Sequence, residues 1–223
     1  MIPTPKVDWL ALAPTLALLG ASGVALLGSV LVPSWMRRFF AAIVVLAGFI
    51  TSGVFAFDDL GLDGAVLQSV AHGLISASMF LLVGMVERRC GTGDLDALGG
   101  MARGRPTLAT VVLVAGMIAL AVPGSATFAG EFLIMAGAYD QGWGYSVVVA
   151  LGIVLAAMYT LRVISAILHV KPGRAVREEA LDLRAGELAL VLPLLLILLG
   201  LSVWPALVSE SAFAAATIAE FLP

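Results

Sequence analysis

Apolar residues dominate the chain in long runs that short polar stretches separate, a pattern typical of membrane-spanning helices. A helix needs about 20 apolar residues to cross the hydrocarbon core of a bilayer. Six runs reach that length, at about Trp9–Val32, Phe39–Phe57, Ala65–Val86, Pro106–Tyr139, Tyr145–Leu168 and Glu187–Leu207. The pattern therefore predicts an all-α membrane protein with about six transmembrane helices.

The fourth run is too long for one straight membrane helix. At ~1.5 Å per residue it would extend about 50 Å, whereas the hydrocarbon core is about 30 Å thick. Pro123 and Gly124 lie near its middle. Proline removes a backbone donor and glycine beside it permits a sharp bend. We therefore predict that the fourth helix is broken at Pro123–Gly124.

Composition places almost the whole chain inside the bilayer. It is 61% hydrophobic and only 12% charged, with a mean hydropathy of +1.08, whereas soluble domains are about 25% charged. Cys90 is the single cysteine, and no group of His, Cys or acidic residues has metal-ligand spacing. We expect no disulfide framework, no metal and no cofactor, and we expect lipid rather than nucleic acid as a partner.

The charges between the predicted segments alternate in sign along the chain. Basic residues follow the first, third and fifth segments: Arg37, Arg38, Arg88, Arg89, Arg103, Arg105, Lys171, Arg174, Arg177 and Arg184. Acidic residues without basic ones follow the second and fourth: Asp58, Asp59, Asp63 and Asp140. Since cytoplasmic loops carry the excess of Lys and Arg, we expect a multi-pass protein of the inner (plasma) membrane with both termini outward.

Three ionisable residues fall inside the predicted membrane cores: His72, Glu131 and Arg162. At 1.5 Å per residue, His72 lies about 10 Å and Glu131 about 12 Å below the outer surface. Burial disfavours the charged forms of both a carboxyl and an imidazole, so a pair at one depth can exchange a proton near neutral pH. We predict proton transfer by Glu131 and His72, and no catalytic residue in the enzymatic sense.

Each of these residues also has a purely structural interpretation. Glu131 can be a protonated or paired structural carboxyl, and His72 can make a hydrogen bond that packs two helices. Arg162 lies near the cytoplasmic end of the fifth segment, where snorkelling to the interface is the default, so it is a secondary candidate. The mixed-charge stretch from Arg174 to Glu187 is interpreted as a solvated loop, with or without an amphipathic surface helix.

Several stretches match, in order, those of a known membrane-protein family. They are Gly64–Gln68, Ala71–Ser76 and Phe80–Gly84, then Glu87–Arg89 with Gly99–Met101, Val122–Leu133, and Tyr159–Arg162. These stretches resemble subunit M of respiratory complex I, an antiporter-like, proton-pumping subunit of NADH:quinone oxidoreductase. The resemblance runs from about Gly64 to Leu207.

By this resemblance, residues 64–223 form the C-terminal proton half-channel, Glu131 matches the carboxylate on the broken helix, and His72 matches the central histidine of the proton path. Residues 1–63 form two helices whose start at Asp8–Pro14 is similar to that of subunit N. The family subunit is roughly twice this length, and its input half, with a membrane-embedded lysine, has no counterpart here. The resemblance implies other membrane subunits of complex I type as partners and no redox site in the chain itself.

Two other functions remain open at this stage. An Mrp-type sodium/proton antiporter subunit shares the ancestry and the motifs of this family. A structural membrane remnant that conducts no ions is the second alternative.

Overall fold

The computed structural model describes residues 48–56, 58–95, 97–169, 171–176 and 181–208. Their regular structure is helical, with no strand in these ranges. The elements are α3 (Asp59–Cys90), α4 (Pro106–Ala119), α5 (Ala126–Gln141), α6 (Trp143–Leu168) and α7 (Ala185–Val203), preceded by helical residues 48–54. The prediction of an all-α protein is confirmed for this part of the chain.

Several predictions lie outside the described residues. These are the first predicted segment, most of the second, and the basic pair Arg37 and Arg38 that separates them. The proposed boundary between residues 63 and 64 falls inside the first turns of α3.

Among the described residues, three helices are long and apolar enough to cross a membrane: α3, α6 and α7. They correspond to the third, fifth and sixth predicted segments. α3 extends beyond the predicted Ala65–Val86 at both ends because it has caps there. The Asp58 carboxylate accepts a hydrogen bond from the Gly61 amide at its start, and Gly91 adopts a left-handed conformation at its end.

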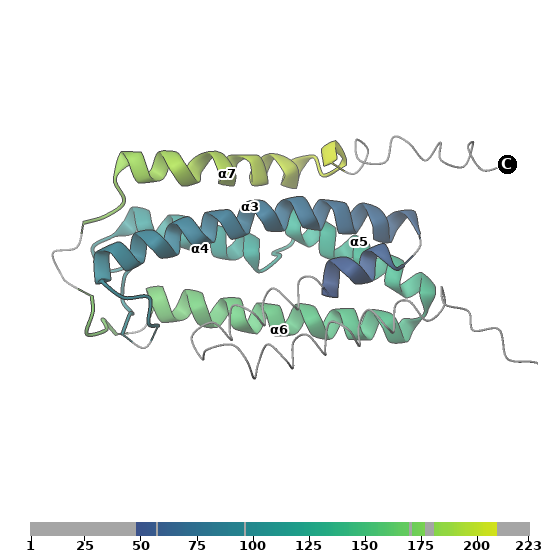
Figure 1. Cartoon of the computed structure of the whole chain (residues 1–223), viewed down its shortest axis with the longest axis horizontal. Coiled ribbons are helices and arrows are strands. Elements are labelled where there is room, and N and C mark those ends of the chain that lie inside the picture. Colours follow the sequence, from purple (N-terminus) through teal and green to yellow (C-terminus); the bar gives the residue numbers. More distant parts are fainter. Residues whose placement is uncertain (1–47, 57, 96, 170, 177–180, 209–223) are drawn as a thin grey trace, which may run out of the picture.

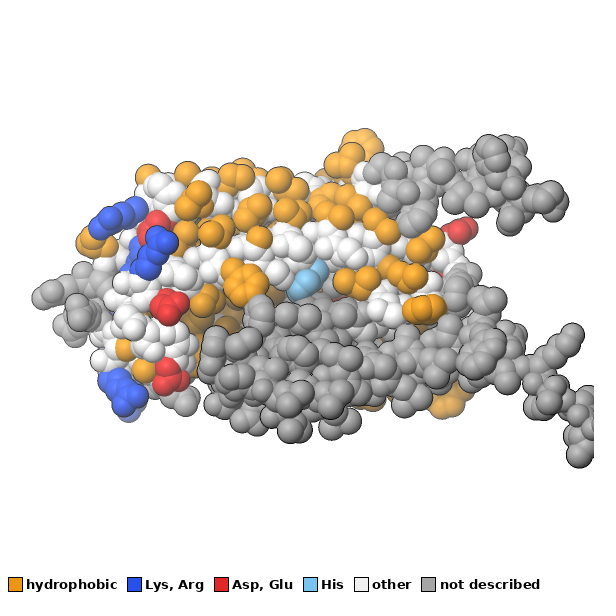
Figure 2. All heavy atoms as spheres, viewed as in Figure 1, with side chains coloured by type: hydrophobic (Ala, Val, Ile, Leu, Met, Phe, Trp, Pro, Cys, Tyr) orange, Lys and Arg blue, Asp and Glu red, His pale blue; other side chains and the backbone are white. Residues whose placement is uncertain are grey.

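α6 and α7 lie on opposite sides of a central layer formed by α3, α4 and α5 (Figure 1). The chain runs along α3 in one direction and returns through α4 and then α5. As a result, the loops that follow α3 and α6 lie at the same end of the bundle, with the start of α7. Lys and Arg side chains gather at this end, while apolar side chains cover the described surface between the ends (Figure 2).

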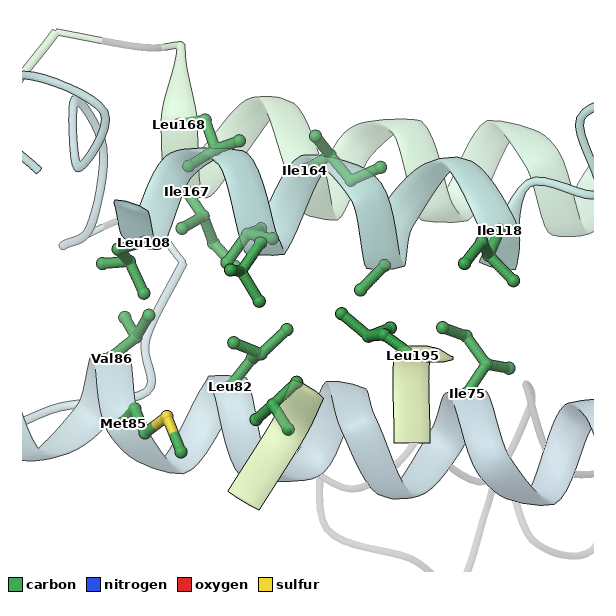
Figure 3. Close-up of a cluster of buried hydrophobic side chains, with 14 of the residues drawn as sticks. Ile75, Leu82, Met85, Val86, Leu108, Ile118, Ile164, Ile167, Leu168 and Leu195 are labelled. Atoms are coloured by element: carbon green, nitrogen blue, oxygen red, sulfur yellow. The ribbon is translucent and has the colours of Figure 1, made fainter. Parts of the chain in front are cut away.

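A buried apolar cluster joins α3, α4, α6 and α7. Leu82 of α3, Leu108 of α4, Ile164 of α6 and Leu195 of α7 all belong to it, and several point toward one another between the helices (Figure 3). The outer faces of α6 and α7 are exposed and equally apolar, as at Leu155 and Leu196. A helix that is apolar on all sides suits a lipid-facing position.

Charged side chains connect three helix ends at the basic end of the bundle. Arg89 of α3 pairs with Glu187 of α7 through two hydrogen bonds, of 3.0 and 2.5 Å. The Asp182 carboxylate accepts hydrogen bonds from the backbone amides of Thr107 and Leu108 at the start of α4, at 2.9 and 2.8 Å. Within the mixed-charge stretch that the sequence predicts to be a solvated loop, Asp182 and Glu187 are half-exposed and also make these contacts with α4 and α3.

Candidate functional site

The helical stretch between Pro106 and Gln141 is interrupted by six non-helical residues, 120–125. Pro123 and Gly124 both lie in this interruption. Ala121 has φ = 51° and Gly124 has φ = 94°, a left-handed region that is unfavourable for alanine and easy for glycine. The strained Ala121 shows that the surrounding structure holds the interruption in place.

Hydroxyl groups satisfy much of the backbone that the interruption exposes. Ser125 caps α5, since its Oγ accepts a hydrogen bond from the Phe128 amide at 3.2 Å. Thr127 donates its hydroxyl to the Ile118 carbonyl at 2.5 Å. Ser202 of α7 accepts from the Ala126 amide at 2.9 Å. Unpaired backbone groups are costly away from water, so these hydroxyls stabilise a break at an apolar location.

Glu131 lies on α5, seven residues after Gly124, and is half-buried. It faces Gln68 of α3, whose Nε2 donates a long hydrogen bond of 3.5 Å to the Oε1 of Glu131. Gln68 is only 1% exposed. Its Oε1 is buried and makes no hydrogen bond with any described residue.

Glycines allow α3 and α5 to approach this closely. A Cβ atom at Gly130 would lie 2.7 Å from the Gln68 Oε1 and 3.0 Å from the Gln68 amide nitrogen. A Cβ atom at Gly64 would lie 2.9 Å from the Gly130 carbonyl oxygen. A side chain at either position would push the helices apart, so the contact between Gln68 and Glu131 depends on these two glycines.

His72 lies one turn beyond Gln68 on α3 and is half-buried. Its Nε2 is 2.7 Å from the Oγ of Ser76. Gln68, His72 and Ser76 recur every four residues, so they form a polar row along one face of the helix. In the described part of the chain, His72 pairs with Ser76 and not with Glu131, and the hydrogen bond from α3 to Glu131 comes from Gln68.

Arg162 lies away from this group. Its side chain is exposed on α6 between exposed Leu161 and half-buried Val163, whereas α6 turns Ile164 and Ile167 toward the core. The structure therefore brings together Glu131 and the His72-bearing face of α3, but not Arg162.

Sequence reasoning missed Gln68 and Ser202. The signal for Gln68 was its spacing of four residues before His72, in a helix whose other residues on that face are mainly apolar. No comparable signal existed for Ser202, because it acts on a backbone amide 76 positions away.

The side chains gathered here can accept and donate protons. A carboxyl, a carboxamide, an imidazole and a hydroxyl all form hydrogen bonds, and the carboxyl and imidazole exchange protons. No cluster of three His, Cys, Asp or Glu side chains able to hold a metal occurs among the described residues. The group therefore suits proton transfer within an apolar layer.

Comparison with known proteins identifies relatives with similar sequences. Residues 43–158 match the family described as NADH:quinone oxidoreductase/Mrp antiporter, TM. NAD(P)H-quinone oxidoreductase chain 4 1 of Synechococcus sp. (strain JA-3-3Ab) is 34% identical over 89% of this chain and 40% of its own length. NADH-quinone oxidoreductase subunit M of Rickettsia prowazekii (strain Madrid E) is 32% identical over 71% of this chain and 32% of its own length. The chain thus spans less than half the length of these relatives.

Solved structures share the fold. A chain in respiratory complex I from Thermus thermophilus with bound NADH superposes with a TM-score of 0.76 at 27% identity, covering 90% of this chain and 43% of that one. A chain in the Mrp complex from Dietzia sp. DQ12-45-1b gives a TM-score of 0.70, covering 88% and 45%, but its 20% identity establishes the fold alone. From the sequence match over residues 43–158, this chain belongs to the NADH:quinone oxidoreductase/Mrp antiporter transmembrane family.

Proposed function

We propose that the chain is an antiporter-like membrane subunit, similar to subunit M of NADH:quinone oxidoreductase, which contributes an outward proton half-channel. One observation carries this proposal: Glu131 follows the interruption between α4 and α5 and contacts Gln68 on the helix that bears His72. A carboxylate beside a broken helix is a recurrent way to build an ion site at membrane depth.

In this proposal α4, residues 120–125 and α5 together cross the membrane as one broken helix, the fourth of six. α4 alone has 14 residues and α5 has 16, so each is too short to span about 30 Å of hydrocarbon. The basic end of the bundle faces the cytoplasm, and both termini face outward across the inner (plasma) membrane. The Pro123–Gly124 end of each half-helix then lies within the bilayer.

Glu131 is the proton-carrying carboxyl, and His72 is the next group along the path toward the cytoplasmic side. The Oγ of Ser76 holds the imidazole ring of His72 in place by its 2.7 Å contact with Nε2. The other ring nitrogen, Nδ1, is then left to exchange a proton. Arg162 is a secondary candidate for the proton path. In this proposal its side chain, exposed on α6, takes part without contacting Glu131 directly.

Other membrane subunits of complex I type are the proposed partners. The chain covers 40% of the Synechococcus relative and 43% of the matching Thermus chain.

Replacing Glu131 by Gln tests this function. The change keeps the shape of the side chain and its hydrogen-bonding capacity, and it removes the titration. We expect normal abundance of the host complex and a large loss of proton flux per electron, since a positioned proton-transfer group typically contributes about 10²–10⁴-fold to a rate. Complex abundance and flux have to be measured together. Normal assembly with a normal flux ratio would contradict the proposal.

An Mrp-type sodium/proton antiporter subunit is the second candidate. The family description that matches residues 43–158 includes Mrp antiporters, and the Dietzia Mrp complex contains a chain of the same fold. Sodium-dependent proton movement in vesicles would favour this candidate, whereas movement that depends on quinone reduction and not on sodium favours the first.

A further inference from the structure

Gln68 is a buried polar side chain that contacts Glu131. It is 1% exposed, it donates from Nε2 to the Glu131 carboxyl, and its Oε1 makes no hydrogen bond in the described part of the chain. A buried acceptor without a donor is unfavourable. Because this acceptor lies beside a group that gains and loses a proton, it can serve in another state of that group.

We propose that Gln68 is a positioning residue that holds the Glu131 carboxyl in both of its protonation states. A carboxamide carries two donors on its nitrogen and an acceptor on its oxygen. When Glu131 is a carboxylate, the Nε2–H group of Gln68 donates to it. When Glu131 is a carboxylic acid, its O–H group donates to the Oε1 of Gln68. This inference rests on the proposed function of Glu131.

The local geometry permits the required rotation. The last torsion of a glutamine side chain is broad and roughly two-fold, so exchanging the oxygen and nitrogen needs no change in the rest of the side chain. Gly130 makes room for the amide, because a Cβ at that position would lie 2.7 Å from Oε1. The amide therefore lies against the residue directly before Glu131, with Nε2 3.5 Å from the Glu131 Oε1, and the rotation brings Oε1 to the place of Nε2.

Other titratable groups lie on the elements packed around this pair. His72 is one turn away on α3, and the other titratable or charged side chains of α3 and α5 lie toward the ends of those helices: Asp58, Asp59, Asp63, Glu87, Arg88, Arg89, Cys90, Tyr139 and Asp140. α6 carries Tyr145, Tyr159 and Arg162, which are all exposed, and α7 carries Glu187 in its first turn. Among the described side chains, the Glu131 carboxyl accepts a hydrogen bond from Gln68. Gln68 is therefore the side chain whose donor and acceptor respond directly to the proton on Glu131.

Gln68→Met is the variant that tests this role in the intact host complex. Methionine matches the length of glutamine but offers neither donor nor acceptor of comparable strength. We expect normal abundance and a fall in proton flux per electron of about tenfold, the factor expected for losing one hydrogen bond to a charged group. Gln68→Asn keeps both functions on a shorter side chain and should recover part of the flux. The control is Leu67→Met at the neighbouring, fully buried position, which should leave the flux unchanged because this swap conserves volume.

Infrared difference spectra between low and high pH provide a readout that packing alone does not move. Protonation of Glu131 should shift the carbonyl band of the Gln68 amide, because its oxygen acquires a donor. The shift should disappear in Gln68→Met and also in Glu131→Gln. If Gln68→Met does not assemble, the comparison of the unaltered complex with Glu131→Gln still decides the matter.

The results separate this inference from the proposed function. Loss of flux in Glu131→Gln, with a normal flux ratio in Gln68→Met or no amide shift in the unaltered complex, overturns the role of Gln68 and leaves the half-channel intact. A normal flux ratio in Glu131→Gln overturns the half-channel itself, whatever the spectra show.

Discussion

At the scale of single residues, the contact between α3 and α5 is controlled by glycine. Gly130 lies directly before Glu131, and the space that its missing side chain leaves is occupied by Gln68. Small residues permit close helix approach in membranes, where apolar burial between helices provides little driving force. The absence of a methyl group at one position thus decides whether the two polar side chains meet.

Gly130→Ala should move α3 away from α5 and lower the thermal stability of the host complex. The new Cβ would lie 2.7–3.0 Å from atoms of Gln68, including its backbone nitrogen, so relief requires movement of the helix and not only of a side chain. We expect a destabilisation of about 1–3 kcal/mol, the usual cost of overpacking, visible as a lower thermal midpoint of the purified complex. Gly73→Ala on α3 is the matched control, because its Cβ would meet nothing within 4 Å. Equal midpoints for the two variants would contradict the role of Gly130.

At the scale of elements, the start of α4 depends on a side chain from a distant loop. α4 has no side-chain cap of its own, and Asp182 supplies one by accepting from the amides of Leu108 and Thr107. Burial of the carboxyl acts against its charge. The hydrogen bonds from Leu108, Thr107 and Leu183 outweigh that effect and lower the pKa of Asp182 below its ordinary value.

This cap makes a pH-dependent contribution to stability. Because the pKa of Asp182 is lower in the folded state than in the unfolded state, the contribution is present above the ordinary pKa of an aspartate and is lost as pH falls through the lowered value. Asp182→Asn should cost about 1 kcal/mol near neutral pH, the typical cost of losing a helix cap. The difference in thermal midpoint between variant and parent should shrink on acidification. A difference that stays constant from neutral to acidic pH would contradict this account.

At the scale of the whole molecule, the loops after α3 and α6 meet at one end and are interlocked. The Met101 amide donates to the Ile167 carbonyl at 3.0 Å, and the Ala175 amide donates to the Ala97 carbonyl at 3.1 Å. A Cβ at Gly173 would lie 2.2 Å from two carbonyl oxygens of the other loop. The basic end is thus a packed structure, and a single orientation in the membrane applies to all of its loops.

Cysteine labelling tests that orientation. Gly61 is unsuitable as the outward probe, because a Cβ there would lie 2.6 Å from the Cβ of Ala56. Asp59 and Arg103 are both exposed, so we choose Asp59→Cys and Arg103→Cys in a Cys90→Ser background. An impermeant reagent added to intact cells should label Asp59→Cys, and Arg103→Cys should react only after the membrane is opened. The opposite pattern would reverse the proposed orientation of the half-channel.

The sequence by itself determined the helical character, the three long spans among the described residues and the interruption of the helical structure near Pro123 and Gly124. Length, hydropathy and backbone chemistry are local properties, so they can be read without knowing which helices touch. The contact of Gln68 with Glu131 was decided only by the tertiary structure, as were the caps from Ser202 and Asp182 and the position of Arg162 on the outer surface. Each of these depends on the register and rotation of one helix against another. Packing sets that register between residues far apart in the chain, as where Gly64 and Gly130 let α3 and α5 approach closely.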